Sequence, residues 1–287
     1  MNLQTGAKSR RKELAQQSAP KRASQFDARR IRLIVLFLAI TIGGIVAIKL
    51  ASIPPKETKF GYELVDSHPH DPKSFTQGLL YLDGKLYEST GLDRDDLNSK
   101  SQLRIVDLKS GVVEKEITLE DGMFGEGLTM LDGKLYQLTW RDNKVFVYDK
   151  DLNLLNTFDY PSEGWGLTND GKRLILSDGT SELKFVDPKT FEVVSTLDVR
   201  HRNYRLRDLN ELEYIDGYIY ANVWHADFIA KISPASGKVV ATIDLSGMHK
   251  HGREDVLNGI AYNPDSGNWF VTGKLWPKVY EIKVVKK

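Results

Sequence analysis

A pattern of two short strands joined by a tight turn recurs five times in the chain, and this repeat limits the fold more than any other feature. Each copy contains a run with β-strand character, an Asp-Gly-type turn and a second such run, which is a strong signal for a β-hairpin. The five copies occupy 75–91, 124–140, 163–179, 208–224 and 256–274. A looser hairpin follows each of the first four copies, at 103–119, 145–158, 183–199 and 229–245.

One position in each copy fixes the register and the period of the repeat. The residues at this position are Gln77, Glu126, Trp165, Asn210 and Asn258. Four strands in about 40 to 50 residues is the period of propeller blades. We therefore predict an all-β fold, a five-bladed β-propeller over 59–287. A ring of six blades with one degenerate unit is the alternative.

The fifth copy is incomplete, because only one further strand-like run, 278–284, follows it. We predict that 60–65, from the other end of the domain, supplies the missing strand. This pairing would close the ring and leave no free sheet edge.

The segment before the repeats has a different composition. Residues 1–32 carry nine Lys or Arg residues against two acids, and an uncharged, mostly apolar run follows at 33–48. An apolar run with a basic flank on its N-terminal side is typical of a signal anchor, and a cleaved signal peptide is the alternative. We predict a single-pass, membrane-anchored protein whose propeller domain is extracytoplasmic. Its parts would be a basic cytoplasmic tail at 1–30, a transmembrane signal anchor at 31–50, a linker at 51–58 and the propeller domain at 59–287.

Charge and cysteine content exclude several classes of function. Subtracting the nine basic and two acidic residues of the first segment from totals of 40 and 39 leaves 31 basic and 37 acidic residues. The folded part is thus mildly acidic and gives no indication of nucleic-acid binding. The chain has no cysteine, so it has no disulfide, no thiol nucleophile and no cysteine zinc site.

The motif 124-FGEGL-128 places Glu126 between two glycines at the start of a strand. Glycine inside a strand pattern marks a bulge or a close approach of backbone or ligand. Because the innermost strands of a propeller line its central channel, the five register positions should meet at one mouth of that channel.

A second set of equivalent positions lies at the ends of the second strands. It consists of Gly91, Trp140, Gly179, Trp224 and Lys274. Two of the five positions hold glycine, so the fold does not require a large side chain there. The large side chains at the other three positions are therefore interpreted as lining a pocket and not as filling the core. Together with nearby aromatic residues they predict an aromatic box around Glu126; these neighbours are Phe75, Phe124 and Trp165.

The chain also contains, in order, the motifs FTQGL, ESTG, FGEGL, GWGL, LNELEY, NVW, VLNGIAY and TGKLWPK. In this combination it resembles the plant- and bacterial-type glutaminyl-peptide cyclotransferases over essentially all of 60–285. The resemblance implies a five-bladed propeller and an acyltransferase that converts an N-terminal glutaminyl residue into pyroglutamyl with release of ammonia. The loop 92–101 is longer and more acidic than the corresponding family segment, which bears on substrate preference at the rim.

The resemblance also implies roles for individual residues. Glu126 of FGEGL would be the catalytic acid/base, with Lys274 of TGKLWP and Asn210 of LNELEY as its catalytic partners. The expected substrate-binding residues are Phe75, Gln77, Phe124, Trp140, Trp165, Trp224 and, from its place in the ring, Asn258.

These residue types suit the chemistry. Ring closure is attack by the α-amine on its own side-chain carbonyl, so the reacting groups are already in one molecule. One carboxylate can take a proton from the amine and deliver a proton to the departing ammonia, and aromatic walls would raise its pKa toward the useful range. We assign stabilisation of the oxyanion to Lys274 and Asn210.

We expect no metal and no other cofactor, with a structural Ca²⁺ left open. The expected partners are peptides or proteins with N-terminal glutamine, and the membrane through the anchor. We expect no nucleic acid and a monomer. The histidine pairs, His68 with His70 and His249 with His251, are interpreted as surface polar residues.

Two other functions are weighed. The oxygen donors of Glu126, Asn210 and Asn258 form one ring, and a Ca²⁺-dependent lactonase or esterase-like propeller would use such a ring. A non-catalytic propeller that serves as an interaction module is the other alternative, because a fold does not imply a function.

Overall fold

The computed structural model describes residues 57–93, 96, 98–250, 252 and 255–287. The chain divides into two units, Met1–Pro55 and Lys56–Lys287. The predicted tail and anchor, and most of the predicted linker, lie outside the described residues.

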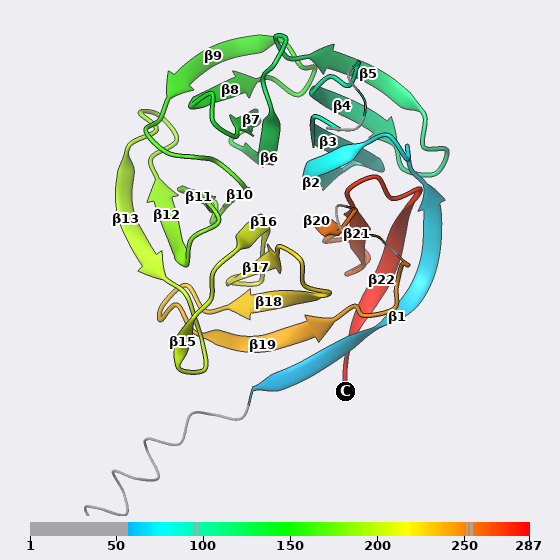
Figure 1. Cartoon of the computed structure of the whole chain (residues 1–287), viewed down its shortest axis with the longest axis vertical. Coiled ribbons are helices and arrows are strands. Elements are labelled where there is room, and N and C mark those ends of the chain that lie inside the picture. The colour runs from blue at the N-terminus through cyan, green and yellow to red at the C-terminus, as the bar shows by residue number, and fades with distance from the viewer. Residues whose placement is uncertain (1–56, 94–95, 97, 251, 253–254) are drawn as a thin grey trace, which may run out of the picture. The chain divides into compact units, whose positions relative to one another are not determined.

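The described residues form strands and no helix, and the strands build sheets that stand around a common centre (Figure 1). The first four-stranded sheet contains β2 (Phe75–Leu82), β3 (Lys85–Gly91), β4 (Gln102–Asp107) and β5 (Val113–Thr118). The second contains β6 (Gly125–Leu131), β7 (Lys134–Thr139), β8 (Lys144–Tyr148) and β9 (Leu154–Asp159). The third contains β10 (Leu167–Asn169), β11 (Leu174–Leu176), β12 (Glu182–Val186) and β13 (Val193–Asp198).

An eight-stranded sheet completes the circle, in the order β16-β17-β18-β19-β1-β22-β21-β20. One half contains β16 (Leu209–Ile215), β17 (Tyr218–Val223), β18 (Phe228–Ile232) and β19 (Val239–Asp244). The other contains β20 (Leu257–Tyr262), β21 (Trp269–Gly273), β22 (Lys278–Lys286) and β1 (Thr58–Pro69).

The predicted pairing of the two ends of the domain is confirmed. β1 runs antiparallel to β22, from Phe60 opposite Lys286 to Pro69 opposite Lys278. β1 is longer than the predicted 60–65, and its first residues also pair in parallel with β19, with Thr58 opposite Ala241. This second pairing, which the sequence did not predict, joins the two halves into one sheet.

Two-residue Asp-Gly turns close three of the five innermost hairpins, as predicted, and the hairpins of the third and fifth copies have longer turns. Asp83 and Gly84 both have positive φ, 50° and 82°, which is the backbone of a two-residue hairpin turn. Asp132 with Gly133, and Asp216 with Gly217, repeat this conformation. A small additional hairpin, β14 (Arg200–His201) with β15 (Tyr204–Arg205), was not predicted.

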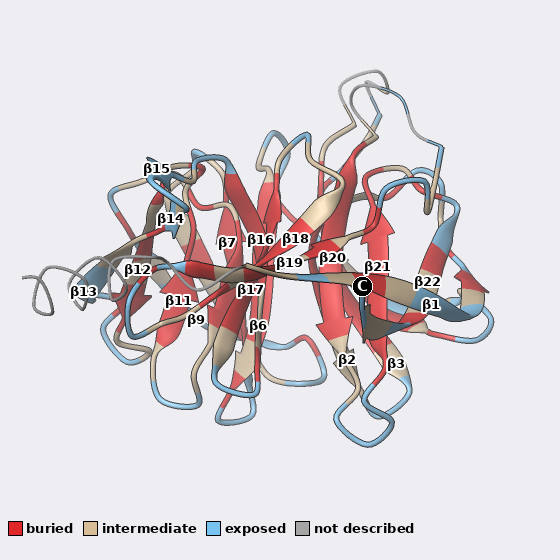
Figure 2. Ribbon diagram, turned by 90° about the horizontal axis from the view of Figure 1, so that it is seen from below, coloured by how far each residue is buried: buried red, intermediate tan, exposed pale blue. Residues whose placement is uncertain are grey.

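The hydrophobic core lies between neighbouring sheets. One cluster joins Leu103 of β4 to Leu128 of β6, and another joins Leu86 of β3 to Phe270 of β21, which closes the circle. The other clusters connect the remaining neighbours in the same way. Figure 2 shows the result, with strands buried through the body of the unit and exposed loops at both ends.

The first strand of each repeat is the innermost. In cyclic order β2, β6, β10, β16 and β20 each contact the next, and β20 returns to β2 (Figure 1). The fold is therefore all-β and propeller-like, with the first strands around the centre.

The predicted localisation, a single-pass protein anchored in the membrane by an N-terminal helix, is corrected. No helix in the part of the chain that the structure describes is long and apolar enough to cross a membrane, so the anchor is not supported. The segment predicted to cross, 31–50, lies outside the described residues.

Candidate active site

Five polar side chains predicted for the site are buried. They are Gln77, Glu126, Asn210, Asn258 and Lys274, each no more than 5% exposed. The first four come from the inner strands β2, β6, β16 and β20, and Lys274 follows β21 directly. Trp165, the remaining register position, lies just before β10 and is half-buried.

The four inner-strand residues sit at irregularities of the β-ladder. The register of β6 with β7 shifts between Gly125 and Leu128, on either side of Glu126. Equivalent shifts flank Gln77, Asn210 and Asn258. A bulge turns a side chain away from the regular pleat and is common beside active sites. The glycine pattern of FGEGL thus marks a bulge, as predicted.

A chain of hydrogen bonds holds one oxygen of Glu126. The Gln77 side-chain amide donates to Glu126 Oε1 at 3.0 Å. The Asn258 amide donates to Gln77 Oε1 at 3.0 Å, and also to the Thr76 carbonyl at 3.0 Å. Because Asn258 occupies the Gln77 oxygen, the Gln77 amino group must face Glu126.

The other oxygen of Glu126, Oε2, is buried without a hydrogen-bond partner. Burial raises the pKa of Glu126 well above its ordinary value, the Lys274 ammonium opposes this shift, and the negative charge of Glu163 adds to it. A carboxyl group with a raised pKa and an unused oxygen is suited to proton transfer.

Half-buried aromatic rings contact one another in two groups around these polar residues. In the first, Phe75 and Phe124 have ring centroids 5.9 Å apart, and Phe124 and Trp140 are 5.6 Å apart. In the second, Trp165 and Trp224 meet edge to face at 5.6 Å. Lys274 connects the groups on one side, because its Nζ lies 4.8 Å from the Phe75 ring centroid and 5.9 Å from that of Trp224.

The two glycines of the second register set make room for this box. A Cβ added at Gly91 would lie 2.2 Å from the Phe124 ring, and one at Gly179 would lie 2.7 Å from the Trp165 ring. Gly91 therefore admits the aromatic side chain of the next repeat, and Gly179 admits that of its own repeat.

The turn that carries Lys274 is held by backbone and side-chain hydrogen bonds. The Lys274 amide donates to the Val256 carbonyl at 2.9 Å, and the Leu275 amide donates to the Ser74 carbonyl at 2.7 Å. His70 adds a third connection, since its Nδ1 lies 2.6 Å from the Trp276 carbonyl oxygen.

His70 belongs to a buried charged cluster, so its interpretation as a surface residue is wrong. Its Nε2 lies 3.0 Å from Glu88, which also accepts hydrogen bonds from Thr76 and Arg104. Burial alone would raise the pKa of Glu88, but Arg104 and His70 outweigh it and lower that pKa. This cluster joins the strand that carries Gln77 to the turn that carries Lys274.

Asn210 is placed mainly through its backbone. Its carbonyl oxygen accepts a hydrogen bond from the Ser177 hydroxyl at 2.7 Å. Its side-chain oxygen, Oδ1, is buried without a hydrogen-bond partner, as is Oε2 of Glu126. A polar ligand that reaches the site would find both atoms unused.

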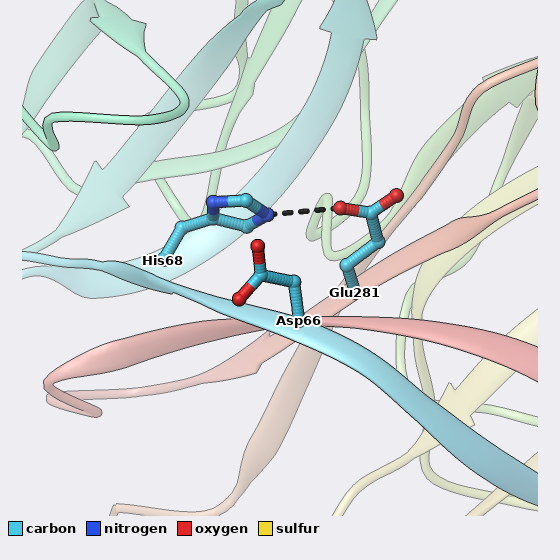
Figure 3. A group of neighbouring side chains, drawn as sticks. All are labelled: Asp66, His68 and Glu281. Atoms are coloured by element: carbon cyan, nitrogen blue, oxygen red, sulfur yellow. Dashed lines mark hydrogen bonds and ion pairs between the residues drawn. The ribbon is translucent and has the colours of Figure 1, made fainter.

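His68 is also buried rather than exposed. Among the described residues it forms, with Asp66 and Glu281, the one group whose ligand atoms lie close enough to hold a metal, within 4.8 Å of one another (Figure 3). Both oxygens of Glu281 already have partners, His68 Nε2 at 3.0 Å and the Asn268 amide. We assign no metal to this group.

Glu163 is the residue of the site that sequence reasoning missed. It accepts hydrogen bonds from the indole Nε1 atoms of both Trp140 and Trp165. Its position two residues before Trp165, directly before the motif GWGL, was an available signal, because an acid beside an aromatic motif can bind an indole N–H.

Comparison with known proteins gives consistent matches. The model of the glutamine cyclotransferase family matches residues 36–284. The glutaminyl-peptide cyclotransferase of Arabidopsis thaliana is 47% identical over an alignment of 231 residues, and the match covers 77% of this chain and 71% of that protein. The crystal structure of the Myxococcus xanthus glutaminyl cyclase matches with a TM-score of 0.74 and 35% identity, over 81% of this chain and 100% of that chain.

Proposed function

The chain belongs to the glutamine cyclotransferase family, and we propose that it converts N-terminal glutaminyl residues of peptides and proteins into pyroglutamyl residues with release of ammonia. The observation that carries this function is the buried carboxyl group of Glu126 in the aromatic box, with one oxygen fixed by Gln77 and the other unused. The lactonase and interaction-module alternatives are set aside, because the family match covers the whole repeat region.

Glu126 acts as the acid/base of the reaction. The neutral α-amine of the substrate attacks the side-chain carbonyl carbon, and Oε2 of Glu126 accepts the proton that the attacking nitrogen loses as the ring forms. The carbon–nitrogen bond to the leaving amide nitrogen then breaks, and Glu126 returns the proton so that ammonia departs. The raised pKa of Glu126 favours the second transfer, which needs a proton donor near neutral pH.

Lys274 and Asn210 stabilise the intermediate. The carbonyl oxygen becomes negative when the amine attacks, and a buried ammonium group with an amide is a suitable partner for that charge. The aromatic residues fold the glutaminyl side chain toward its own amine and exclude water, whose attack would only deamidate the substrate.

The scaffold for this site is a propeller of five blades. Among the described residues, five hydrophobic clusters lie between neighbouring groups of strands. Each of the three four-stranded sheets is one blade, and the two halves of the eight-stranded sheet are two more. The catalytic domain comprises 59–287, acts as a monomer and requires no cofactor. Light scattering tests the oligomeric state.

A peptide experiment tests the function. The protein is incubated with a Gln-initiated peptide and, separately, with the same peptide initiated by Asn or Glu. We expect a mass loss of about 17 Da for the Gln peptide alone, with one ammonia released per peptide. A Gln peptide that stays unchanged, while a carboxylic ester is cleaved, would contradict the proposal.

A further inference from the structure

One carboxylate bridges the gap between the two aromatic groups of the box. Phe75, Phe124 and Trp140 form one group, and Trp165 and Trp224 form the other. Glu163 Oε2 accepts a hydrogen bond from Trp140 Nε1 at 2.9 Å and from Trp165 Nε1 at 3.2 Å. The indole N–H groups of Trp140 and Trp165, one from each aromatic group, thus share a single acceptor atom.

The second oxygen of Glu163 is also occupied. Arg141 Nε donates to Glu163 Oε1 at 2.9 Å, and the guanidinium group lies 3.8 Å from the Trp140 ring centroid. Burial alone would raise the pKa of Glu163, but hydrogen bonds from Arg141, Trp165 and Trp140 outweigh it and lower that pKa. Glu163 is therefore an anion fixed at both oxygens.

We propose that Glu163 is a positioning residue for the cyclisation, one that orients the indoles of Trp140 and Trp165 and places a fixed negative charge near Glu126. The proposal rests on the proposed function. Lys274 lies over Phe75 of the first group and Trp224 of the second. Glu163 bonds Trp140 of the first group and Trp165 of the second, so the two charged residues connect the two groups into a closed ring.

The charge has a second consequence, because it acts on the acid/base. The titratable groups that face Glu126 are Lys274, Glu163 and Tyr160, whose hydroxyl donates to the Thr139 carbonyl at 2.6 Å. Burial raises the pKa of Glu126, Lys274 lowers it and Glu163 raises it further. Removing the Glu163 charge should therefore lower the pKa of Glu126.

Three substitutions separate the geometric effect from the charge effect. Glu163→Gln keeps a carbonyl oxygen for the two indole N–H groups and removes the charge. Glu163→Asp keeps the charge, but its side chain is one methylene shorter and cannot reach both indoles. Glu163→Leu removes both properties. Asp159→Asn is the control, because it removes an exposed carboxylate on β9, which belongs to the sheet that carries Glu126.

The first measurement is the pH dependence of kcat on a Gln-initiated peptide. Relative to wild type and Asp159→Asn, we expect Glu163→Gln to move the acid limb to lower pH with a small loss of kcat. Glu163→Asp should leave the limb in place and raise KM, and Glu163→Leu should lower kcat/KM by about tenfold or more. An unmoved acid limb in Glu163→Gln, or an unchanged kcat/KM in Glu163→Leu, overturns the proposal.

The second measurement does not depend on activity. The chain has five tryptophans, and their indole N–H resonances report hydrogen bonding in an NMR spectrum. After assignment with Trp140→Phe and Trp165→Phe, we expect both resonances to move upfield in Glu163→Leu and to stay near their wild-type positions in Glu163→Gln. Resonances that do not move in Glu163→Leu overturn the proposal, even if wild type shows no cyclisation and the proposed function has failed.

Discussion

Gln77 donates a hydrogen bond to Glu126 Oε1 across 3.0 Å, from a strand of the neighbouring sheet. Asn258, from a third sheet, fixes the orientation of the Gln77 amide. The proposed acid/base is therefore held by two successive hydrogen bonds: Gln77 and Glu126 lie 49 positions apart along the chain, and Asn258 and Gln77 lie 181 positions apart. The catalytic role that we propose for Glu126 therefore depends on the assembled ring and not on any one repeat.

Gln77→Leu should raise the pKa of Glu126, because the donated hydrogen bond stabilises the charged carboxylate. We expect the acid limb of the pH profile of kcat to move to higher pH, and kcat to fall by about tenfold. Asn258→Leu should produce a smaller shift in the same direction, since Gln77 remains but is no longer oriented. A shift to lower pH in either variant would contradict this arrangement.

Lys274→Met should lower kcat/KM by about a hundredfold to a thousandfold, because the intermediate loses its cationic partner. The acid limb should also move to higher pH, since the Lys274 ammonium normally lowers the pKa of Glu126. Steady-state kinetics across the pH range measures both effects. Lys144→Met, which removes a lysine from a solvent-exposed ion pair with Asp159, is the control and should behave as wild type; equal losses in the two variants would assign no special role to Lys274.

Chelation should leave turnover of a Gln-initiated peptide unchanged, because each proposed step is carried by a side chain. The measurement is ammonia release before and after exhaustive treatment with a chelator, and again after addition of Ca²⁺. Loss of activity that Ca²⁺ restores would show that a metal takes part.

Buried Glu211 should make stability depend on pH. Burial raises its pKa well above the ordinary value, and the negative charge of Glu213 adds to the shift. A raised folded-state pKa contributes stability that is fully present below the unfolded-state value and is lost as pH rises through the folded-state value. In Glu211→Gln the carbonyl can still accept the Ile260 amide hydrogen bond.

The melting temperature of Glu211→Gln should therefore rise relative to wild type as pH increases from about 5 to about 9. Differential scanning calorimetry measures both proteins in matched buffers. A constant difference in melting temperature across that range would show that Glu211 titrates alike in the folded and unfolded chain.

Much of the scaffold could be predicted because its signals are local. Asp83 and Gly84 define a turn within four residues, and the repeat places Gln77 and Glu126 in one register without knowledge of the packing. The pairing of β1 with β22 followed from counting strands in an incomplete repeat.

The features that were missed depend on partners distant in sequence or on sheet packing. His68 contacts Glu281, which is 213 positions away, and nothing near His68 in the sequence indicates burial. Glu163 lies near Trp165 in sequence, but its second indole, Trp140, arrives only when neighbouring sheets pack. The parallel pairing of β1 with β19 depends on how two sheets lie side by side.

The most direct test compares wild type with Glu126→Gln on one Gln-initiated peptide, with ammonia release and product mass followed together. Gln has nearly the same shape as Glu but cannot exchange a proton, so folding should be preserved while kcat falls by about a hundredfold to ten-thousandfold. Cyclisation by Glu126→Gln at the wild-type rate would contradict the assignment of Glu126 as the acid/base.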